Sequence, residues 1–391
     1  MISILFVDDE ENIILGLKRM LRPMKREWNL YFAESGEEAL RILATEKIDI
    51  IVTDMRMPKM DGATLLQHVK KEYPGITRII LSGYSEKEFI MRTSSTAHQF
   101  LPKPCDLEIL KSAIYRLIKL RQLVLNPKIK EKVSIVSNLP SLPKLYHDLE
   151  NELNSNTVSL KKIGNIISQD LSMTAKILQM VNSAFFGLPQ AISDIIQAVS
   201  YLGVDTIKSL VLFHHLFTTY DKDEEMTNSL KALWSHSLYI ANISKKILSL
   251  KVSNAQQVEN AFIAGMLHDI GKLILLQIPE YKEKILELNN LSGMQIREIE
   301  EQLFDTDHAI VGGYLLGLWG LPDVIVEAAA FHHIPSSVGE TNFSILSAVH
   351  LAHLSMKPQE IDQSYINALG IENEIPAFLN TIENSEVNNI E

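Results

Sequence analysis

Five short runs rich in β-branched residues alternate with amphipathic stretches over the first 124 residues. The runs predict strands at 2–7, 30–33, 48–53, 77–81 and 99–101, and apolar residues recur at helical spacing between them. Strict alternation of this kind predicts a parallel sheet with helices on both faces and right-handed crossover connections. We therefore expect residues 1–124 to form an α/β domain around a five-stranded parallel sheet.

Acidic side chains, a hydroxyl group and a lysine follow the ends of these strands. Asp8 and Asp9 follow the first strand, Asp54 the third, Ser82 the fourth and Lys103 the fifth. Ligands of such sheets lie beyond the carboxyl ends of the strands, and gathered carboxylates favour a hard divalent cation, of which Mg²⁺ is the natural candidate. Asp54, beside a cation and a lysine, is then placed as a nucleophile towards a phosphoryl group. The competing interpretation, solvated turn residues, does not explain why they all follow strand ends.

The segments around these residues, at 5–10, 53–62, 81–83 and 100–104, resemble the receiver domain of bacterial two-component response regulators. The resemblance covers essentially all of residues 1–124 and implies a flavodoxin-like fold. It also implies a role for each residue: Asp54 as phosphoacceptor, Asp8, Asp9 and Asp54 as Mg²⁺ ligands, Lys103 as partner of the phosphoryl group, Ser82 as switch hydroxyl and Phe100 as the aromatic that moves with it.

Charge is divided unevenly along the chain, whose formal net charge is −11. Residues 1–125 hold 19 of the 37 basic and 17 of the 48 acidic side chains, which leaves 18 basic and 31 acidic for the remainder. This balance argues against direct DNA binding. The single cysteine, Cys105, excludes an internal disulfide, and no run approaches the roughly 20 apolar residues of a membrane span. We expect a cytoplasmic protein without a secretory signal or membrane association.

The second half of the chain has helical spacing almost throughout. A helix is predicted over 109–125, and a charged break that begins at Asn126 predicts a linker at 125–134. Beyond it, repeats such as Ile163, Ile166 and Ile167 predict an all-α domain over 135–370. Residues 371–391, rich in Asn and Glu, are expected to form a frayed acidic tail.

Ten of the twelve histidines lie in this second half. Buried histidines without partners would be costly, so their gathering suggests shared ligands. His268 and Asp269 are adjacent; on a helix their side chains would point about 100° apart and could reach one ion only over the edge between them. Lys272 would share the face of His268, where it could contact a phosphate. The alternative is a structural pair in which histidine donates to aspartate.

These residues resemble the HD superfamily of metal-dependent phosphohydrolases. A more extended resemblance, carried by 139–143, 167–178, 181–187 and 192–203, is to its HDOD branch, whose members mostly serve signalling. The superfamily resemblance implies a set of candidate ligands for iron, manganese, zinc or nickel: His236, His268, Asp269, His308, His332 and His333.

Two departures from the superfamily pattern bear on activity. Its last aspartate follows an alanine, whereas Ala352 is followed here by His353, which could still bind a metal with altered charge and reach. The Gly-Tyr-Pro segment of the cyclic-dinucleotide phosphodiesterases is missing after His332 and His333, so that branch is disfavoured.

These features together predict a response regulator. A sensor histidine kinase would phosphorylate Asp54, and the HDOD domain would respond through contact with an unknown downstream protein. The alternative is a phosphorylation-gated metal-dependent phosphohydrolase. A homodimer remains an open alternative to a single chain.

Overall fold

The computed structural model describes residues 1–82, 96–103, 106–136, 139–140, 143–153, 155, 157–182, 192–204, 207, 217–218, 224–287, 293–339, 342–356, 361–376 and 378. The chain divides into two compact units. Residues 1–138 form the body of unit 1, and most of the residues from 139 onward form unit 2. Within the described residues, no helix combines the length and apolar character needed to cross a membrane.

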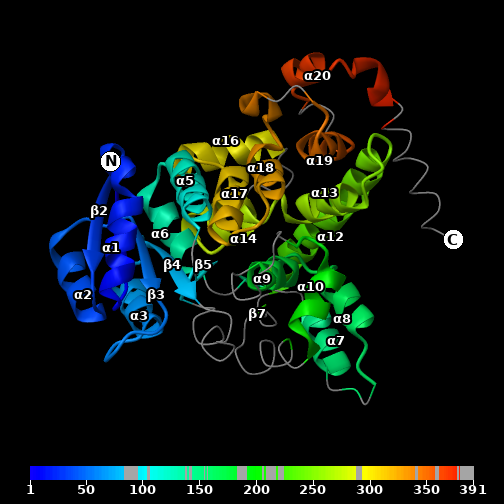
Figure 1. The fold of residues 1–391 in the computed structure, drawn as a ribbon. Coiled ribbons are helices and arrows are strands. Elements are labelled where there is room, and N and C mark those ends of the chain that lie inside the picture. The colour runs from blue at the N-terminus through cyan, green and yellow to red at the C-terminus, as the bar shows by residue number, and fades with distance from the viewer. Residues whose placement is uncertain are drawn as a thin grey trace. The chain divides into compact units, whose positions relative to one another are not determined.

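Unit 1 is built on a five-stranded parallel sheet with the strand order β2-β1-β3-β4-β5 (Figure 1). The sheet predicted from the sequence is confirmed, and each strand agrees with its predicted range to within two residues. β1 is almost wholly buried, as expected of a central strand covered on both faces. The strands are β1 (Ile2–Val7), β2 (Trp28–Ala33), β3 (Ile50–Asp54), β4 (Thr77–Ser82) and β5 (Gln99–Pro102).

Four helices of unit 1 begin at polar caps. Ser35, Asp61, Asp106 and Asn126 each accept a hydrogen bond from a backbone N–H of the first turn that follows. The described helices are α1 (Glu11–Met20), the 3-10 helix η1 (Arg22–Arg26), α2 (Gly36–Thr45), α3 (Gly62–Glu72), α5 (Leu107–Leu123) and α6 (Pro127–Ile135).

Helix α6 occupies the segment that was predicted as a linker. Asn126 caps it and Pro127 stands at its first position, so the charged break in the sequence marks a helix start. Ile129 and Val133 are fully buried. Residues 127–135 therefore form a helix of unit 1 with a buried apolar face, and not an extended connection.

A buried arginine forms a hydrogen bond with the C-terminal end of α6. Arg78, in β4, is 1% exposed and its guanidinium donates to the carbonyl oxygen of Ser134, in α6, at 2.6 Å. The same guanidinium donates to the carbonyls of Thr96 at 2.5 Å and Ile76 at 3.0 Å. The ring of His98 also contacts the Ser134 carbonyl at 2.7 Å. These charge-assisted contacts join α6 to the sheet edge opposite the candidate phosphorylation site.

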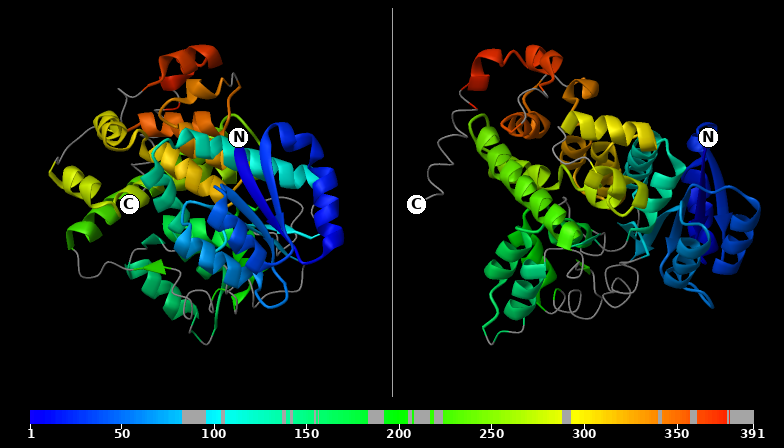
Figure 2. Two further views of the ribbon diagram at one scale, coloured as in Figure 1. Left: turned by 90° about the vertical axis from the view of Figure 1, so that its left-hand side faces the viewer. Right: turned by 180° about the vertical axis from the view of Figure 1, so that it is seen from behind.

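The described part of unit 2 is almost entirely helical, as predicted, and includes one short pair of two-residue strands. Its long helix α12 packs along α13 and α19 (Figure 2). Its elements are β6 (Leu139–Pro140), α7 (Pro143–Leu153), α8 (Leu160–Ile167), α9 (Leu171–Val181), α10 (Ile195–Leu202), β7 (Phe217–Thr218), α12 (Glu224–Ser249), α13 (Ala255–Leu267), α14 (Gly271–Leu275), α15 (Pro279–Glu287), α16 (Gly293–Phe304), α17 (His308–Leu318), α18 (Asp323–Phe331), η4 (Pro335–Val338), α19 (Ile345–Leu354), α20 (Gln363–Leu369) and η6 (Glu372–Glu374).

Part of the expected C-terminal tail packs onto unit 2. Ile371 and Phe378 are only 4% and 3% exposed. Lys251 forms an ion pair with Glu374 and lies over the rings of Phe343 and Phe378. The prediction that fraying starts at residue 371 therefore differs from the structure at these positions, because a few apolar residues suffice to anchor the segment; residues 379–391 lie outside the described residues.

Candidate functional site

The carboxyl edge of the sheet in unit 1 gathers the predicted acids and lysine. Asp8 and Asp9 follow β1, Asp54 is the last residue of β3, and Lys103 follows β5. Because the strands are parallel, these positions share one edge. Ser82 ends β4 at the same edge, although its side chain lies outside the described residues.

Lys103 connects the two buried carboxylates of this edge. Its Nζ lies 2.7 Å from Asp8 Oδ2 and 2.6 Å from Asp54 Oδ1. Burial raises the pKa of Asp54, and the Lys103 ammonium partly offsets that rise. Burial alone would lower the pKa of Lys103, but its hydrogen bonds to Asp54 and Asp8 raise it. The ammonium therefore stays charged beside a basic carboxylate oxygen.

Three carboxylates at this edge offer oxygen ligands to a cation. Single oxygens of Asp8, Asp9 and Asp54 all lie within 4.8 Å of one another. An all-oxygen donor set of this kind fits Mg²⁺. The loop after β3 approaches closely because residue 62 is glycine, where a Cβ would overlap the carbonyl oxygen of Asp54. Phe100 is half-buried and packs against the core.

A second cluster, which we call the histidine centre, lies in unit 2. Five elements contribute to it: α12, the turn between α13 and α14, the first residue of α17, the residues that follow α18, and α19. Every candidate ligand predicted from the sequence is a member: His236, His268, Asp269, His308, His332, His333 and His353.

Asp269 lies in the middle of the histidine centre. Its Oδ1 lies 3.1 Å from Nε2 of His308 and 3.9 Å from Nε2 of His332. Its Oδ2 lies 3.4 Å from Nε2 of His268 and 3.6 Å from Nε2 of His236. Burial alone would raise the pKa of Asp269, but Lys272 and the histidines lower it well below the ordinary value. Asp269 is therefore an anion that can bridge two sets of imidazoles.

The histidines form two groups around this carboxylate. In the first histidine group, ligand atoms of His236, His268 and His353 lie within 4.8 Å of one another. The second histidine group, His308, His332 and His333, meets the same limit. Each group offers three imidazoles, a number of ligands typical of transition-metal sites.

Outer contacts orient the rings of the histidine centre. Nδ1 of His268 lies 2.6 Å from the carbonyl oxygen of Gly265, and Nδ1 of His332 lies 2.9 Å from that of Ala329. Because a carbonyl only accepts, Nδ1 must carry the hydrogen and Nε2 is left with its lone pair. Within the described residues, Nε2 of His268 and of His332 makes no hydrogen bond. Buried ring nitrogens that make no hydrogen bond and lie close to one another and to a carboxylate fit a bound metal ion.

A buried carboxylate, Glu300 of α16, holds His308. Its Oε2 accepts from the backbone N–H of His308 at 2.8 Å and contacts Nδ1 at 2.6 Å, while its Oε1 accepts from the hydroxyl of Tyr281 at 2.6 Å. Burial opposes a charge on His308, yet Glu300 raises its pKa to about 9. Burial instead lowers the pKa of His268, and lowers the pKa of His332 and His333 well below 6.5.

Three details of the histidine centre differ from the prediction or add to it. His268 and Asp269 lie on the turn between α13 and α14 and not within a helix, because α13 ends at Leu267. Lys272 pairs with Asp269 Oδ2 at 2.5 Å and lines the pocket described below, and its contact with a phosphate stays a prediction. Glu300 was not predicted; its position between Ile296 and Phe304, on the apolar face of α16, is the signal that could have found it.

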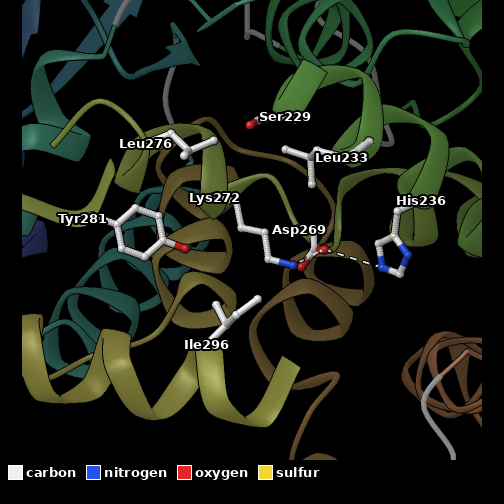
Figure 3. A pocket seen from close by; sticks show the side chains of 9 residues that line it. Ser229, Leu233, His236, Asp269, Lys272, Leu276, Tyr281 and Ile296 are labelled. Carbon is white, nitrogen blue, oxygen red and sulfur yellow. Dashed lines mark hydrogen bonds and ion pairs between the residues drawn. The ribbon is translucent and has the colours of Figure 1, made fainter. Parts of the chain in front are cut away.

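A pocket of about 310 Å³ opens beside the histidine centre (Figure 3). Its walls are mainly apolar, whereas His236, Asp269 and Lys272 form one polar end. A ligand in this pocket would place its polar group next to the centre and its apolar part against the walls. The lining residues are Ser229, Ala232, Leu233, His236, Asp269, Lys272, Leu276, Tyr281 and Ile296.

Comparison with known families agrees with this geometry. Residues 4–115 match the family described as the response regulator receiver domain, and residues 139–335, half of the chain, match the HDOD domain. The chain belongs to the HDOD family. It is a response regulator with a receiver domain and an HD-type output domain.

Individual relatives share parts of this HDOD protein. An "Uncharacterized protein" of Treponema pallidum is 23% identical over 57% of this chain and 43% of its own length. Sensor kinase CckA of Brucella abortus is 37% identical over 30% of this chain and 12% of its own. The chain thus spans less than half the length of these curated relatives.

Two solved structures also share parts of the chain. The receiver domain of an HD domain-containing protein from Pseudomonas fluorescens is 31% identical, covers 31% of this chain and 97% of its own, and has a TM-score of 0.30. The MmoQ response regulator of Methylococcus capsulatus is 21% identical, covers 62% of this chain and 98% of its own, and has a TM-score of 0.47.

Proposed function

We propose that phosphorylation of Asp54 by a sensor histidine kinase switches this response regulator, and that the HDOD domain transmits the switch to a downstream protein. The observation that carries the proposal is the Lys103 ammonium between Asp8 and Asp54, at 2.7 and 2.6 Å. The similarity to a sensor kinase supports a phosphohistidine donor.

Each residue of this edge has a separate role in the proposed phosphoryl transfer. An Asp54 oxygen attacks phosphorus, so that a new O–P bond forms while the bond to the donor histidine nitrogen breaks and the imidazole leaves. Lys103 offsets charge on the transferring oxygens. Asp8, Asp9 and Asp54 would hold Mg²⁺, which supplies further positive charge when bound.

Acetyl phosphate with Mg²⁺ tests the phosphoacceptor. We expect intact-mass analysis to show one added phosphoryl group on the wild type and on Glu37→Gln, a matched change of an exposed acid in α2. We expect no added group on Asp54→Asn, because the amide is not a nucleophile. Uptake by Asp54→Asn would contradict the assignment.

Transmission to the HDOD domain is tested by hydrogen exchange. We expect phosphorylation of the full-length protein to change exchange in β5, in α6 and in unit 2, because receiver switches act through a two-state rearrangement. Asp54→Asn treated with acetyl phosphate is the control. Identical exchange with and without the phosphoryl group would overturn the proposed control of output.

A second candidate function is metal-dependent phosphoester hydrolysis at the histidine centre. The pocket favours hydrolysis, because Asp269 of the histidine centre and its ion-pair partner Lys272 both line the polar end of the pocket. A bound metal would polarise a phosphoryl oxygen and lower the pKa of water. Water oxygen would bond to phosphorus while the ester P–O bond breaks and the alcohol leaves with a proton; Lys272 would face the phosphoryl oxygens.

Metal analysis followed by a panel of phosphoesters separates the two functions. If hydrolysis occurs, we expect Asp269→Asn to lose both metal and turnover, since this carboxylate is shared by both histidine groups. We expect Lys272→Met to keep the metal and lose turnover. Metal binding without turnover of any ester in the panel would exclude hydrolysis of those esters. Signalling through protein interaction would then be the function that stands.

A further inference from the structure

We propose that His353 sets the metal preference of the histidine centre. With an imidazole at this position, the first histidine group selects an ion that prefers nitrogen ligands, such as Zn²⁺, over Mn²⁺. This inference rests on the metal centre described above and specifies which ions that centre accepts.

His353 reaches into the centre from α19. It is 2% exposed, and one of its ring nitrogens lies within 4.8 Å of ligand atoms of His236 and His268. Its ring centroid lies 5.7 Å from that of His236 and 5.9 Å from that of His268. The imidazole therefore occupies a ligand position in the first histidine group and is not a bystander in the core.

The donor set of the centre is strongly biased towards nitrogen. Its candidate ligands are six imidazoles and one carboxylate, Asp269, which is also paired with Lys272 at 2.5 Å. Glu300 and Asp307 are also buried near His308. The oxygens of Glu300 are bonded to His308 and Tyr281, and those of Asp307 accept from Arg297 and from the backbone N–H of Ile310. Among the described residues, no second carboxylate oxygen faces the first histidine group.

Ligand chemistry turns this bias into selectivity. Carboxylate and water oxygens suit Mn²⁺ and Mg²⁺, whereas imidazole suits zinc, copper, iron and nickel. Affinity for Zn²⁺ exceeds that for Mn²⁺ at most sites, so the informative quantity is the ratio of the two affinities and how residue 353 changes it. Replacing an imidazole by a carboxylate adds an oxygen donor and a negative charge at the same place, and both changes favour Mn²⁺.

The test measures Zn²⁺ and Mn²⁺ binding to metal-stripped full-length protein by equilibrium dialysis and metal analysis, in competition with a chelator of known affinity. We expect His353→Asp to lower the ratio of Zn²⁺ to Mn²⁺ affinity at least tenfold. His353→Asn, which supplies an oxygen without a charge, should shift the ratio less in the same direction. His68→Asp, the same substitution at an exposed site in α3, should leave the ratio unchanged.

The outcomes distinguish this inference from the metal centre itself. If both residue-353 variants bind metal with the wild-type ratio, His353 does not set the preference, while the centre stands. If neither the wild type nor any variant binds Zn²⁺ or Mn²⁺, the metal centre fails and this inference fails with it. Unfolding curves recorded alongside show whether each variant is folded, and His353→Asn carries the test should His353→Asp unfold.

Discussion

At the residue scale, His350 shows how a side chain outside the histidine centre holds it in place. Its Nδ1 lies 2.7 Å from the carbonyl oxygen of His332, and its Nε2 accepts from the backbone N–H of Asp362 at 3.2 Å. A histidine that donates at Nδ1 and accepts at Nε2 is neutral, and burial lowers its pKa accordingly. His350 thereby fixes the turn that carries His332 and His333.

The charge on His308 predicts how the metal-free protein responds to pH. Its folded pKa of about 9 exceeds the ordinary value of 6.5, so its contribution to stability is complete below pH 6.5 and is lost as the pH rises through 9. The full contribution is on the order of 3 kcal/mol. Chemical unfolding in the presence of a chelator should therefore show that the unfolding free energy of unit 2 falls between pH 6.5 and 9.

The control for this prediction is Glu300→Gln, which removes the carboxylate that raises the pKa of His308. His268 and His332, whose pKa values lie below 6.5, add no slope in this window. We expect the variant to show a flatter dependence above pH 6.5. An unchanged slope in the variant would mean that another group titrates there.

At the element scale, small residues let the helices of unit 2 approach closely around the centre. A Cβ on Gly271, in α14, would overlap the carbonyl oxygen of His308, in α17. A Cβ on Gly265, in α13, would lie 2.7 Å from Cα of Ala241, in α12. The backbones that carry Asp269 and His308 are close because these positions have no side chain.

Gly271→Ala should therefore disturb the centre as well as the fold. We expect it to cost at least about 1–3 kcal/mol of unfolding free energy, as overpacking does, and to reduce bound metal because it displaces Asp269 from His308. Gly16→Ala in α1 is the matched control, since nothing lies within 4 Å of its added Cβ. That change should stabilise unit 1 by about 0.5–1 kcal/mol. Full metal content in Gly271→Ala would show that the close approach is dispensable.

At the scale of the whole molecule, α6 shifts the end of the receiver unit beyond the boundary drawn from the sequence. Ile129 and Val133 belong to unit 1 and are fully buried, and the Ser134 carbonyl accepts from Arg78. Removing the helix would expose apolar surface and leave a buried guanidinium short of an acceptor, which is costly. The chain therefore continues towards the output domain from the end of a partly buried helix of the receiver unit, α6, and not from a loose linker.

Two fragments test this boundary. We expect residues 1–136 to be more stable than residues 1–124 by about 2 kcal/mol or more in urea unfolding, because two fully buried side chains and one charged hydrogen bond are lost. Arg78→Ala in the longer fragment should remove much of the difference, whereas Lys119→Ala, an exposed change in α5, should not. Equal stability of the two fragments would place the boundary where the sequence suggested.

The sequence was most informative where a residue type and a strand end coincide. Asp8, Asp54 and Lys103 were placed correctly at one edge because short β-branched runs locate the buried strands of a parallel sheet, and parallel strands align their ends. The role of Glu300 was not predicted, because only the folding of the chain brings this carboxylate of α16 to His308. The helix at 127–135 was missed because its cap, Asn126-Pro127, also marks turns.

The histidine centre joins side chains that are 117 residues apart along the chain, from His236 to His353, and five separate elements meet there. An ion bound at this point would act as a cross-link, adding about 1.4 kcal/mol to the stability of unit 2 for every tenfold rise in free metal above its dissociation constant. The stability of the output domain would then depend on the concentration of free metal, while the phosphorylation of the receiver domain depends on the kinase. Under the proposed function, metal supply and phosphorylation would then both act on the same output domain.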